Sequence, residues 1–314
     1  MVFRRRLEKL DRPSAVAIGN FDGFHAGHRQ IVEMLAAEAQ RRRLASVVLT
    51  FQPHPRVFFR HPIQLISTDR QRLEMLKRQP LDRLFFLDFA GVVDCPAGEF
   101  VRDALLGALR MEALVVGEDF RWGRGREGDL ASLAALAAAE RFSVVQVPGV
   151  EIDGRRVTSS LIRKRLAAGA IREANRMLEK PYAIEGVVVR GAGRGRELGF
   201  PTMNIASEND ILPGGVFHTE LELLGPPVPG GRDVGAQKAP PGRLASATFI
   251  GRAPSFTDPE RPLRVETHVP GFRGTVYGRR VRLHFLDKIR AERKFASASA
   301  LVEQIRRDIA SLAI

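Results

Sequence analysis

The first half of the chain alternates short apolar runs with longer segments of helical periodicity, and this alternation limits the folds open to it. The apolar runs are too short to be helices, so they read as buried strands. Strands and helices in repeated order predict a parallel sheet covered by helices, with ligands at the carboxyl ends of the strands. The expected strands are 15–18, 46–51, 84–87, 113–116 and 143–147, and the expected helices are 30–43, 70–77, 97–109, 131–140, 159–168 and 171–178.

From Tyr182 onward the pattern changes to β-rich runs separated by Gly and Pro, which predicts an antiparallel sheet or a small barrel. We therefore expect two domains, 1–182 and 183–314, each of ordinary size. The Pro/Gly-rich segment 225–242 is expected to be an exposed, mobile loop. The expected strands are 183–189, 216–224, 244–249, 264–269 and 279–285, followed by a closing helix at 297–312.

Composition narrows the class of protein. Hydrophobic residues make up 44% of the chain and charged residues 27%, which is typical of a globular protein. No apolar run approaches the roughly 18 residues of a spanning helix, and the first residues lack the apolar stretch of a signal peptide. Cys95 is the single cysteine, so an internal disulfide is impossible and a cytoplasmic location is expected.

The net charge of +13 raises the question of nucleic acid, because basic surfaces attract phosphate chains. The basic residues are, however, dispersed along the sequence, and aromatic residues make up only 7% of it. A surplus of arginine suits small polyphosphate ligands equally well. The expected partners are therefore small-molecule substrates, without nucleic acid or membrane, and the sequence predicts nothing about self-association.

A glycine-rich turn follows the first expected strand and leads into a helix. Such a turn directs backbone N–H groups and the positive end of the helix at one point, where phosphate binds. His25 and His28 lie three residues apart, so both imidazoles can face the same oxygens, and Gly27 lets a phosphate approach closely. Half of a zinc site, or two surface histidines, are the alternatives. The turn reads Gly19-Asn20-Phe21-Asp22-Gly23-Phe24-His25-Ala26-Gly27-His28.

A hydroxyl-rich segment, Val157–Arg163, opens a later expected helix. Ser159 and Ser160 can cap that helix and bind phosphate, while Arg163 adds a fixed positive charge. On its own the segment is equally an ordinary capped amphipathic helix.

The strongest cluster of the second half is Gly191–Asn204, which reads GAGRGRELGFPTMN. Close glycines can wrap anionic oxygens, and Arg194 supplies charge, although a solvated hairpin turn would look much the same. Thr202 and Asn204 alternate on an extended stretch, so both side chains point the same way. A hydroxyl and an amide oxygen are suitable ligands for Mg²⁺ bound to ATP phosphates.

The turn with HAGH at its centre resembles the nucleotidyltransferase signature, and Val157–Arg163 resembles the ISSTxxR motif of that superfamily. The segments 50–55 (TFQPHP) and 117–123 (GEDFRWG) are similar to stretches of the flavin and nucleotide pocket of prokaryotic FAD synthetases. The resemblance implies ATP contacts at Gly19, Asn20, Phe21, Asp22, Gly27, Arg156, Ser159 and Ser160, and catalytic roles for His25, His28 and Arg163. It implies flavin contacts at Phe51, Pro53, His54, Asp119, Phe120 and Arg121, where Phe120 and Trp122 offer flat apolar surface.

Gly191–Asn204 closely resembles the GxxRGxxLGFPTxN signature of riboflavin kinases. Downstream, 264–268 (RVETH) matches the strand that carries the catalytic glutamate of that family, and 286–295 resembles its closing segment. The resemblance implies ATP contacts at Gly193, Arg194 and Gly199, Mg²⁺ ligands at Thr202 and Asn204, Glu266 as general base, and Arg290 near the flavin.

Together the two signatures are similar, in order and over nearly the whole chain, to the prokaryotic bifunctional riboflavin kinase/FAD synthetase (FMN adenylyltransferase) family. This implies an α/β Rossmann-like nucleotidyltransferase domain followed by a β-barrel riboflavin kinase domain with a C-terminal helix. The substrates and products would be ATP, riboflavin, FMN and FAD, with Mg²⁺ in both reactions.

Some positions depart from the family pattern, and they bear on kinase efficiency. They are Leu161, Met203, Ala253, Ser255, Pro270–Gly271 and the longer loop 225–242. Two alternatives therefore stay open. One is an adenylyltransferase with a weakened kinase domain. The other is a flavin- or nucleotide-binding regulator without turnover, whose basic surface would bind RNA.

Overall fold

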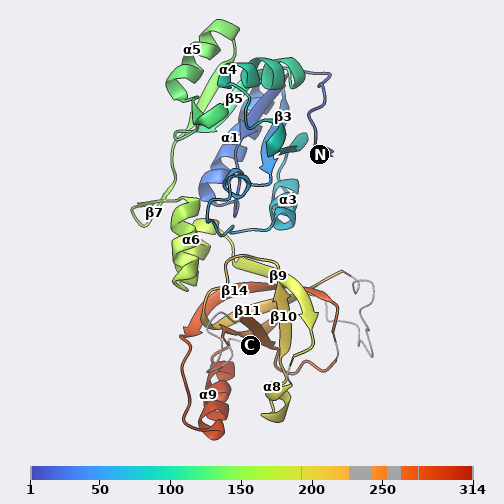
Figure 1. The fold of residues 1–314 in the computed structure, drawn as a ribbon, viewed down its shortest axis with the longest axis vertical. Coiled ribbons are helices and arrows are strands. Elements are labelled where there is room, and N and C mark those ends of the chain that lie inside the picture. Colours follow the sequence, from blue (N-terminus) through green and yellow to red (C-terminus); the bar gives the residue numbers. More distant parts are fainter. Residues whose placement is uncertain (1, 192, 226–241, 253–262, 275, 313–314) are drawn as a thin grey trace. The chain divides into compact units, whose positions relative to one another are not determined.

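The structure is a computed structural model that describes the chain except residues 1, 192, 226–241, 253–262, 275 and 313–314 (Figure 1). The predicted loop 225–242, apart from its two ends, and the departures at Ala253 and Ser255 lie outside the described residues. The chain divides into two compact units, Met1–Ser159 and Ser160–Ile314, and each is described here by itself. The domain boundary at 182/183 stays a prediction.

The first unit is built on a parallel sheet, as the alternating pattern predicts. All five expected strands are present, in the spatial order β1-β4-β3-β2-β5-β6. The edge strand β1 was not predicted, because its apolar run covers only two residues and its pairing is confined to β4. The strands are β1 (Val2–Arg4), β2 (Ser14–Ile18), β3 (Ala45–Gln52), β4 (Arg83–Asp88), β5 (Met111–Gly117) and β6 (Ser143–Val147).

Helices cover both faces of this sheet (Figure 1). The main ones are α1 (Ala26–Arg42), α3 (Asp69–Lys77), α5 (Leu130–Glu140) and α4 (Ala97–Glu99), which runs directly into the π-helix η2 (Phe100–Ala108). The shorter elements are α2 (Pro55–Phe58), η1 (Phe89–Gly91), η3 (Arg124–Arg126) and a two-stranded hairpin of β7 (Glu151–Ile152) and β8 (Arg155–Arg156). The expected helices are confirmed, although α1 begins four residues earlier than predicted because the glycine-rich turn leads straight into it.

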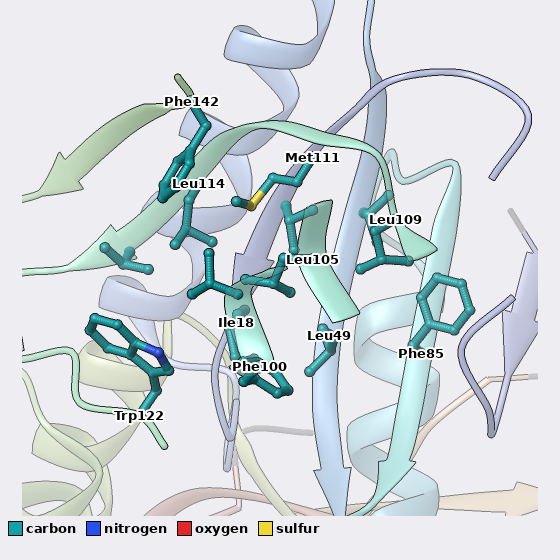
Figure 2. Close-up of a cluster of buried hydrophobic side chains, with 14 of the residues drawn as sticks. Ile18, Leu49, Phe85, Phe100, Leu105, Leu109, Met111, Leu114, Trp122 and Phe142 are labelled. Carbon is teal, nitrogen blue, oxygen red and sulfur yellow. The ribbon is translucent and has the colours of Figure 1, made fainter. Parts of the chain in front are cut away.

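Successive residues of each central strand belong to two different cores, because side chains alternate across a sheet. In β2, Val16 and Ile18 pack with η2 and α5, whereas Ala15 and Ala17 pack with α1 and α3. Figure 2 shows the first of these cores, in which Leu105 lies among sheet residues such as Ile18 and Leu114. With both faces covered, the strands have only their ends left for polar chemistry.

The strand order places a topological switch point at β2, since the chain continues from β2 to β3 on one side and β5 pairs with β2 on the other. Open α/β sheets bind ligands in the crevice outside the carboxyl ends of the strands at such a point. The glycine-rich turn follows β2, and the segment 117–123 follows β5. The fold therefore brings both predicted segments to the expected edge of the sheet.

The second unit is a closed six-stranded antiparallel barrel with helices before and after it, which confirms the predicted barrel and C-terminal helix. The barrel order is β10-β13-β12-β11-β14-β9, and β9 pairs with β10 to close it. The strands are β9 (Tyr182–Val189), β10 (Met203–Ser207), β11 (Gly215–Leu224), β12 (Leu244–Gly251), β13 (Arg264–His268) and β14 (Arg280–Arg290). The helices are α6 (Ser159–Ala167), which begins at the last residue of the first unit, α7 (Ile171–Leu178), α8 (Arg194–Glu197) and α9 (Ala298–Ala310).

The barrel interior holds a chain of hydroxyl groups as well as apolar side chains. Thr219 Oγ1 lies 2.7 Å from both Ser246 Oγ and Thr248 Oγ1, and Thr248 Oγ1 lies 3.0 Å from Thr267 Oγ1. All four side chains are fully buried. Each of these hydroxyls therefore has a hydrogen-bond partner within the core, as buried polar groups require.

An ionic network lies on the outer face of the barrel wall. The guanidinium of Arg282 on β14 donates to the fully buried carboxylate of Glu185 on β9 and lies 3.6 Å from Glu222 on β11. His284 Nε2 lies 2.9 Å from Glu222 Oε2. Burial lowers the pKa of the His284 imidazole, although the hydrogen bond to Glu222 opposes this shift. Burial raises the pKa of Glu222, but the His284 hydrogen bond and the Arg282 charge outweigh it, and the net pKa shift is downward.

Both shifts predict that acid destabilises the barrel. The folded-state pKa of His284 is below its unfolded value of about 6.5, so between the two values the unfolded chain binds more protons. Stability is therefore retained at neutral pH and lost as pH falls through about 6.5, and Glu222 adds to the loss at lower pH. The melting temperature should fall less between neutral and mildly acidic pH for His284→Asn than for the wild type, as measured by thermal unfolding at several pH values.

The matched control is His218→Asn, since His218 lies on the neighbouring strand β11 and is only partly buried. A wild-type melting temperature that does not change over this pH range would contradict the prediction.

Candidate functional site

The turn between β2 and α1 is shaped by one buried carboxylate. Asp22 is 2% exposed, and its oxygens accept hydrogen bonds from the backbone N–H groups of Ile66 and Ser67 at 3.0–3.1 Å and from the Ser67 hydroxyl. Ser67 Oγ in turn accepts from Gly23 N at 3.0 Å. These contacts fix the turn to a distant segment, so both Asp22 oxygens serve the structure of the loop. Contact of Asp22 with ATP stays a prediction.

The two predicted histidines meet at the start of α1. His25 is the N-terminal capping residue of that helix, and its ring stacks on His28 with centroids 3.7 Å apart and an interplanar angle of 19°. The ring of Phe21 packs edge-on against His28 at 5.2 Å. A Cβ at Gly27 would lie 3.4 Å from the His25 ring, so the turn also has little spare room there. Both imidazoles therefore occupy defined positions beside the positive end of α1.

Ser159 connects the second predicted motif to these histidines. His25 Nε2 lies 3.2 Å from Ser159 Oγ, and the same hydroxyl lies 3.5 Å from the Asp22 carbonyl oxygen. Ser159 is also the first residue of α6, as predicted from its hydroxyl. Ser160 and Arg163 lie further along α6, which carries them into the second unit. Of this motif, the described contacts place Ser159 at the histidine pair.

Arg72 on α3 is not among the predicted site residues, although its guanidinium contacts the glycine-rich turn after β2. It is 2% exposed, and its guanidinium donates to the carbonyl oxygens of Asn20 at 2.9 Å and Phe51 at 2.8 Å. An arginine at a core-facing helical position was the signal that could have revealed it. Apart from Asp69 on the same helix, the acceptors of its guanidinium are these backbone carbonyls, which leave no mark in the sequence.

The predicted flavin segment combines a helix cap with a group of aromatic rings. His54 Nδ1 accepts from Arg56 N at 3.1 Å and so caps α2, while the Gln52–Pro53 peptide bond is cis. The Phe51 ring packs edge-on against Phe89 at 5.6 Å. The rings of Phe58 and Phe59 also contact Phe89, and they are 37% and 53% exposed. This aromatic cluster, Phe51, Phe58, Phe59 and Phe89, is an apolar surface open to a flat ligand.

In the segment after β5, the two aromatic residues have different environments. Phe120 stacks on Trp122 with centroids 5.4 Å apart, but Trp122 is buried in the core and its indole N–H donates to the Ala97 carbonyl oxygen at 3.0 Å. Trp122 is thus a structural residue, and Phe120 is partly exposed beside it. Asp119 is 78% exposed at its side chain.

The arginines near this segment are held by carboxylates. Arg156 on β8 forms an ion pair with Glu118 at 2.8 Å and lies 3.8 Å from Asp119, which brings the hairpin to the end of β5. Arg121 pairs with Asp129 at 3.3 Å on the surface. Arg156 therefore lies at the same edge of the sheet as the glycine-rich turn, and its contact with ATP stays a prediction.

In the second unit, strand register brings the predicted base and a predicted metal ligand together. Asn204 on β10 is the direct cross-strand partner of Glu266 on β13, so both side chains lie on the same face. Their neighbours Ile205 and Val265 also pair and are buried in the barrel, which places Asn204 and Glu266 on the outer face of the wall. Phe249 is the partner of Glu266 on β12 and adds an aromatic ring to that face.

The glycine-rich loop lies against the predicted metal ligands. A Cβ at Gly191 would collide with the Asn204 amide, and a Cβ at Gly195 would lie 2.9 Å from Thr202 Oγ1. Only glycine permits so close an approach of the loop backbone. Gly193 and Gly199 have positive φ values of 76° and 85°, on either side of α8. The segment predicted to wrap phosphate is therefore a loop with one helical turn, packed over Thr202 and Asn204.

Arg290, predicted to lie near the flavin, is engaged by the C-terminal helix. Its guanidinium pairs with the buried carboxylate of Asp308 on α9 at 2.8 Å and lies 5.5 Å from the Phe295 ring. Gln304 donates to the same carboxylate at 2.6 Å. Arg290 thus ties the end of β14 to α9, and its contact with flavin stays a prediction.

Among the residues that the structure describes, no group of three or more His, Cys, Asp or Glu side chains could hold a metal ion. Thr202 and Asn204 offer a hydroxyl and an amide oxygen against the glycine-rich loop, and Glu266 adds a carboxylate beside Asn204. Hard oxygen donors in small number suit Mg²⁺, which keeps most of its ligands from water and phosphate. This donor set fits a magnesium ion that arrives with ATP.

Comparison with known proteins identifies the family. The FAD synthetase family model matches residues 7–161, and the riboflavin kinase family model matches residues 178–313. The bifunctional riboflavin kinase/FMN adenylyltransferase of Escherichia coli K12 is 33% identical over 299 residues, covering 93% of this chain and 90% of that protein. The chain belongs to this bifunctional family. The member from Pseudomonas fluorescens is 32% identical and covers 96% of this chain and 92% of its own length.

A solved structure also matches nearly all of the present chain. A crystal structure described as a macrolide-efflux protein from Streptococcus pneumoniae has a TM-score of 0.82 and 26% identity, and covers 96% of this chain and 94% of that one. The efflux description belongs to that protein. Within the described ranges of this chain, no helix has the length and apolar character needed to cross a membrane.

The loop geometry predicts that Gly191→Ala impairs the riboflavin kinase reaction of the family. The added Cβ collides with the Asn204 amide, so the amide must move away from Glu266, and misplacement of this size costs on the order of 10-fold or more in rate. Steady-state kinase assays with varied Mg²⁺ measure the loss. Gly214→Ala is the matched control, because no atom lies within 4 Å of its Cβ position. Equal rates in the two variants would contradict the prediction.

Proposed function

We propose that the second unit phosphorylates riboflavin, giving FMN and ADP, and that the first unit adenylylates FMN, giving FAD and pyrophosphate. ATP is the donor in both reactions. The observation that carries the proposal is the presence of two separate groups of polar residues suited to phosphate chemistry in one chain of this family. One is the stacked His25–His28 pair at the switch point, and the other is the Asn204–Glu266 pair on the barrel wall.

In the kinase reaction, Glu266 acts as general base. Its carboxylate takes the proton of the ribityl 5′-hydroxyl while that oxygen attacks the γ-phosphorus and the bond to ADP breaks. Thr202 and Asn204 would hold Mg²⁺, which when bound neutralises charge on the phosphate oxygens. The glycine-rich loop contributes backbone N–H groups close to these residues. Strand register places Glu266 beside Asn204, which supports a base that acts next to the proposed Mg²⁺ ligand.

In the adenylyl transfer, an FMN phosphate oxygen attacks the α-phosphorus of ATP and pyrophosphate leaves. The backbone of the glycine-rich turn and the positive end of α1 bind the phosphates. His25 and His28 donate to the oxygens on which charge increases in the transition state. Ser159 orients the His25 ring through their 3.2 Å contact. Arg163 is proposed to add positive charge at the β- and γ-phosphates.

The aromatic cluster gives the isoalloxazine ring of FMN an apolar surface. Phe58 and Phe59 are among the most exposed large hydrophobic side chains of the described chain, and an exposed apolar patch marks a binding site more often than a packing defect. The cluster includes Phe51, which lies in the segment with the flavin-pocket resemblance. Flat rings bind such surfaces by stacking or edge contacts.

Met203, one of the departures from the family pattern, faces away from Asn204 and Glu266. Strand alternation points Met203 to the opposite face from Asn204, and its cross-strand partner is Thr267, which is buried in the barrel. The departure therefore leaves the geometry of Thr202, Asn204 and Glu266 intact. This favours an active kinase over an adenylyltransferase with a weakened kinase domain. Cytoplasmic location and the absence of a nucleic-acid partner stay predictions.

The proposed function is tested by incubating the protein with riboflavin, ATP and Mg²⁺ and following the flavins by chromatography. Transient FMN followed by FAD is the expected result. If riboflavin is unchanged but added FMN becomes FAD, the kinase half is inactive. If neither flavin reacts, while RNA binds with a steep salt dependence, the chain is a binding protein and the proposal is wrong.

Glu266→Ala is expected to abolish FMN formation and to leave FMN adenylylation nearly intact, because only the kinase reaction needs this base. Both rates are measured on the same preparation, with riboflavin or FMN as the starting flavin. The adenylylation rate then controls for folding. Parallel loss of both activities would refute the two-site arrangement.

His28→Ala is expected to have the reverse effect. Removal of one donor to the transition state costs on the order of 10²–10³ in rate. FAD formation from FMN should fall by that amount, while the rate of riboflavin phosphorylation by the same sample stays at the wild-type value. An unchanged rate of FAD formation would exclude His28 from the reaction.

A further inference from the structure

The hydrogen bonds of Arg72 on α3 reach both the turn after β2 and the last residues of β3. The Asn20 carbonyl lies in the nucleotide turn after β2, and the Phe51 carbonyl lies at the end of β3, in the flavin segment. The two acceptors are 52 and 21 residues from Arg72 in sequence. A single planar guanidinium therefore joins the part of the site that binds ATP to the part that binds flavin.

The bridge begins where the β-ladder ends. The last paired residues of β2 and β3 are Ile18 and Leu49, followed by one bond from Gly19 N to the Leu49 carbonyl oxygen at 3.2 Å. Beyond this point, backbone pairing no longer fixes the separation of the two strands. Besides Arg72, Thr50 Oγ1 on β3 contacts the Asn20 carbonyl oxygen, at a long distance of 3.4 Å.

Arg72 is itself held rigidly. Asp69 accepts from its guanidinium at 2.7 Å, and the guanidinium lies over the Phe86 ring at 4.9 Å. Burial lowers the pKa of Arg72, while the carboxylates of Asp69 and Asp22 oppose that shift, and an arginine stays charged under such conditions. A fixed fork of N–H donors, held from two sides, transmits the position of one loop to the other.

We infer that Arg72 is a positioning residue for adenylyl transfer. By fixing the Asn20 and Phe51 carbonyls to one guanidinium, it sets the separation between bound ATP and bound FMN, and hence the approach of the FMN phosphate to the α-phosphorus. Near-attack geometry of this kind is worth several orders of magnitude in rate, and displacement by about 1 Å can cost about 10²-fold. The inference rests on the proposed adenylyltransferase function of the first unit.

The same link has a consequence for binding. A ligand that orders one loop also orders the other, because both loops share Arg72, so the two ligands should bind cooperatively. A residue that only stabilises the fold would affect the melting temperature and leave this cooperativity unchanged. Cooperativity between the ligands therefore separates positioning from stabilisation.

The test compares Arg72→Met, Arg72→Lys and the control Arg78→Met in the full-length protein. Arg78 is an exposed arginine at the C-terminal end of the same helix, so its variant removes the same charge without touching the bridge. FMN affinity is measured by FMN fluorescence, with and without a non-hydrolysable ATP analogue. FAD formation from FMN and phosphorylation of riboflavin are measured on the same samples.

For Arg72→Met, we expect FAD formation to fall about 10- to 100-fold, with the kinase rate unchanged and the gain in FMN affinity from the ATP analogue lost. Arg72→Lys should lie between it and the wild type, because an ammonium group lacks the fork that reaches two carbonyls together. This variant keeps the test decisive if Arg72→Met does not fold. Arg78→Met should match the wild type.

Arg72 variants that lower the melting temperature but keep wild-type turnover and cooperativity would overturn the inference, as would equal effects in Arg78→Met. Failure of the proposed function is a separate result. In that case the wild type makes no FAD, while the cooperativity of the two ligands still reports whether Arg72 joins their loops.

Discussion

The first unit depends on the burial of its central strands on both faces. β2 is buried along its whole length, with alternate residues in two separate cores, so neither face of this strand is open to a ligand. Polar chemistry is thereby confined to the loops at the carboxyl ends, where helix N-termini and free backbone N–H groups gather. The histidine pair, the aromatic cluster and Arg156 all lie in loops or at element ends for this reason. Rigid strands beneath them make defined positions possible in otherwise irregular segments.

The barrel positions its polar residues in a different way. Closure removes free sheet edges, and period-2 alternation gives each strand one buried and one outer face. The outer face carries the Asn204–Glu266 pair, so the kinase residues stand on a strand wall instead of in a loop. Precision comes from the register of β10 and β13, since a slip of either strand by one residue would turn its own side chain, Asn204 or Glu266, into the core.

Much of this could be predicted from the sequence, because long periodic segments and dense motifs carry local information. Strand and helix positions, the barrel and the pairing of His25 with His28 followed from spacing, whereas Ser159 was identified by its hydroxyl and by the family resemblance. What the sequence did not predict depends on tertiary partners. Arg72 binds backbone carbonyls, Arg290 is engaged by Asp308 from α9, and Asp22 holds a segment more than forty residues away. Strand β10 was missed because Pro and Gly precede it, and its pairing with two strands comes only from barrel closure.

The hydroxyl chain inside the barrel has a consequence for how the chain can vary. Thr219, Ser246, Thr248 and Thr267 satisfy one another across three strands. Replacing Thr248 by an apolar residue of the same shape removes the hydroxyl that both Thr219 and Thr267 contact, whereas replacing linked positions together removes the need for it. Tolerance at these sites is therefore collective. Single apolar changes are more harmful than linked ones, so an apolar barrel core is reached by concerted substitution, and the four positions are expected to evolve as one unit.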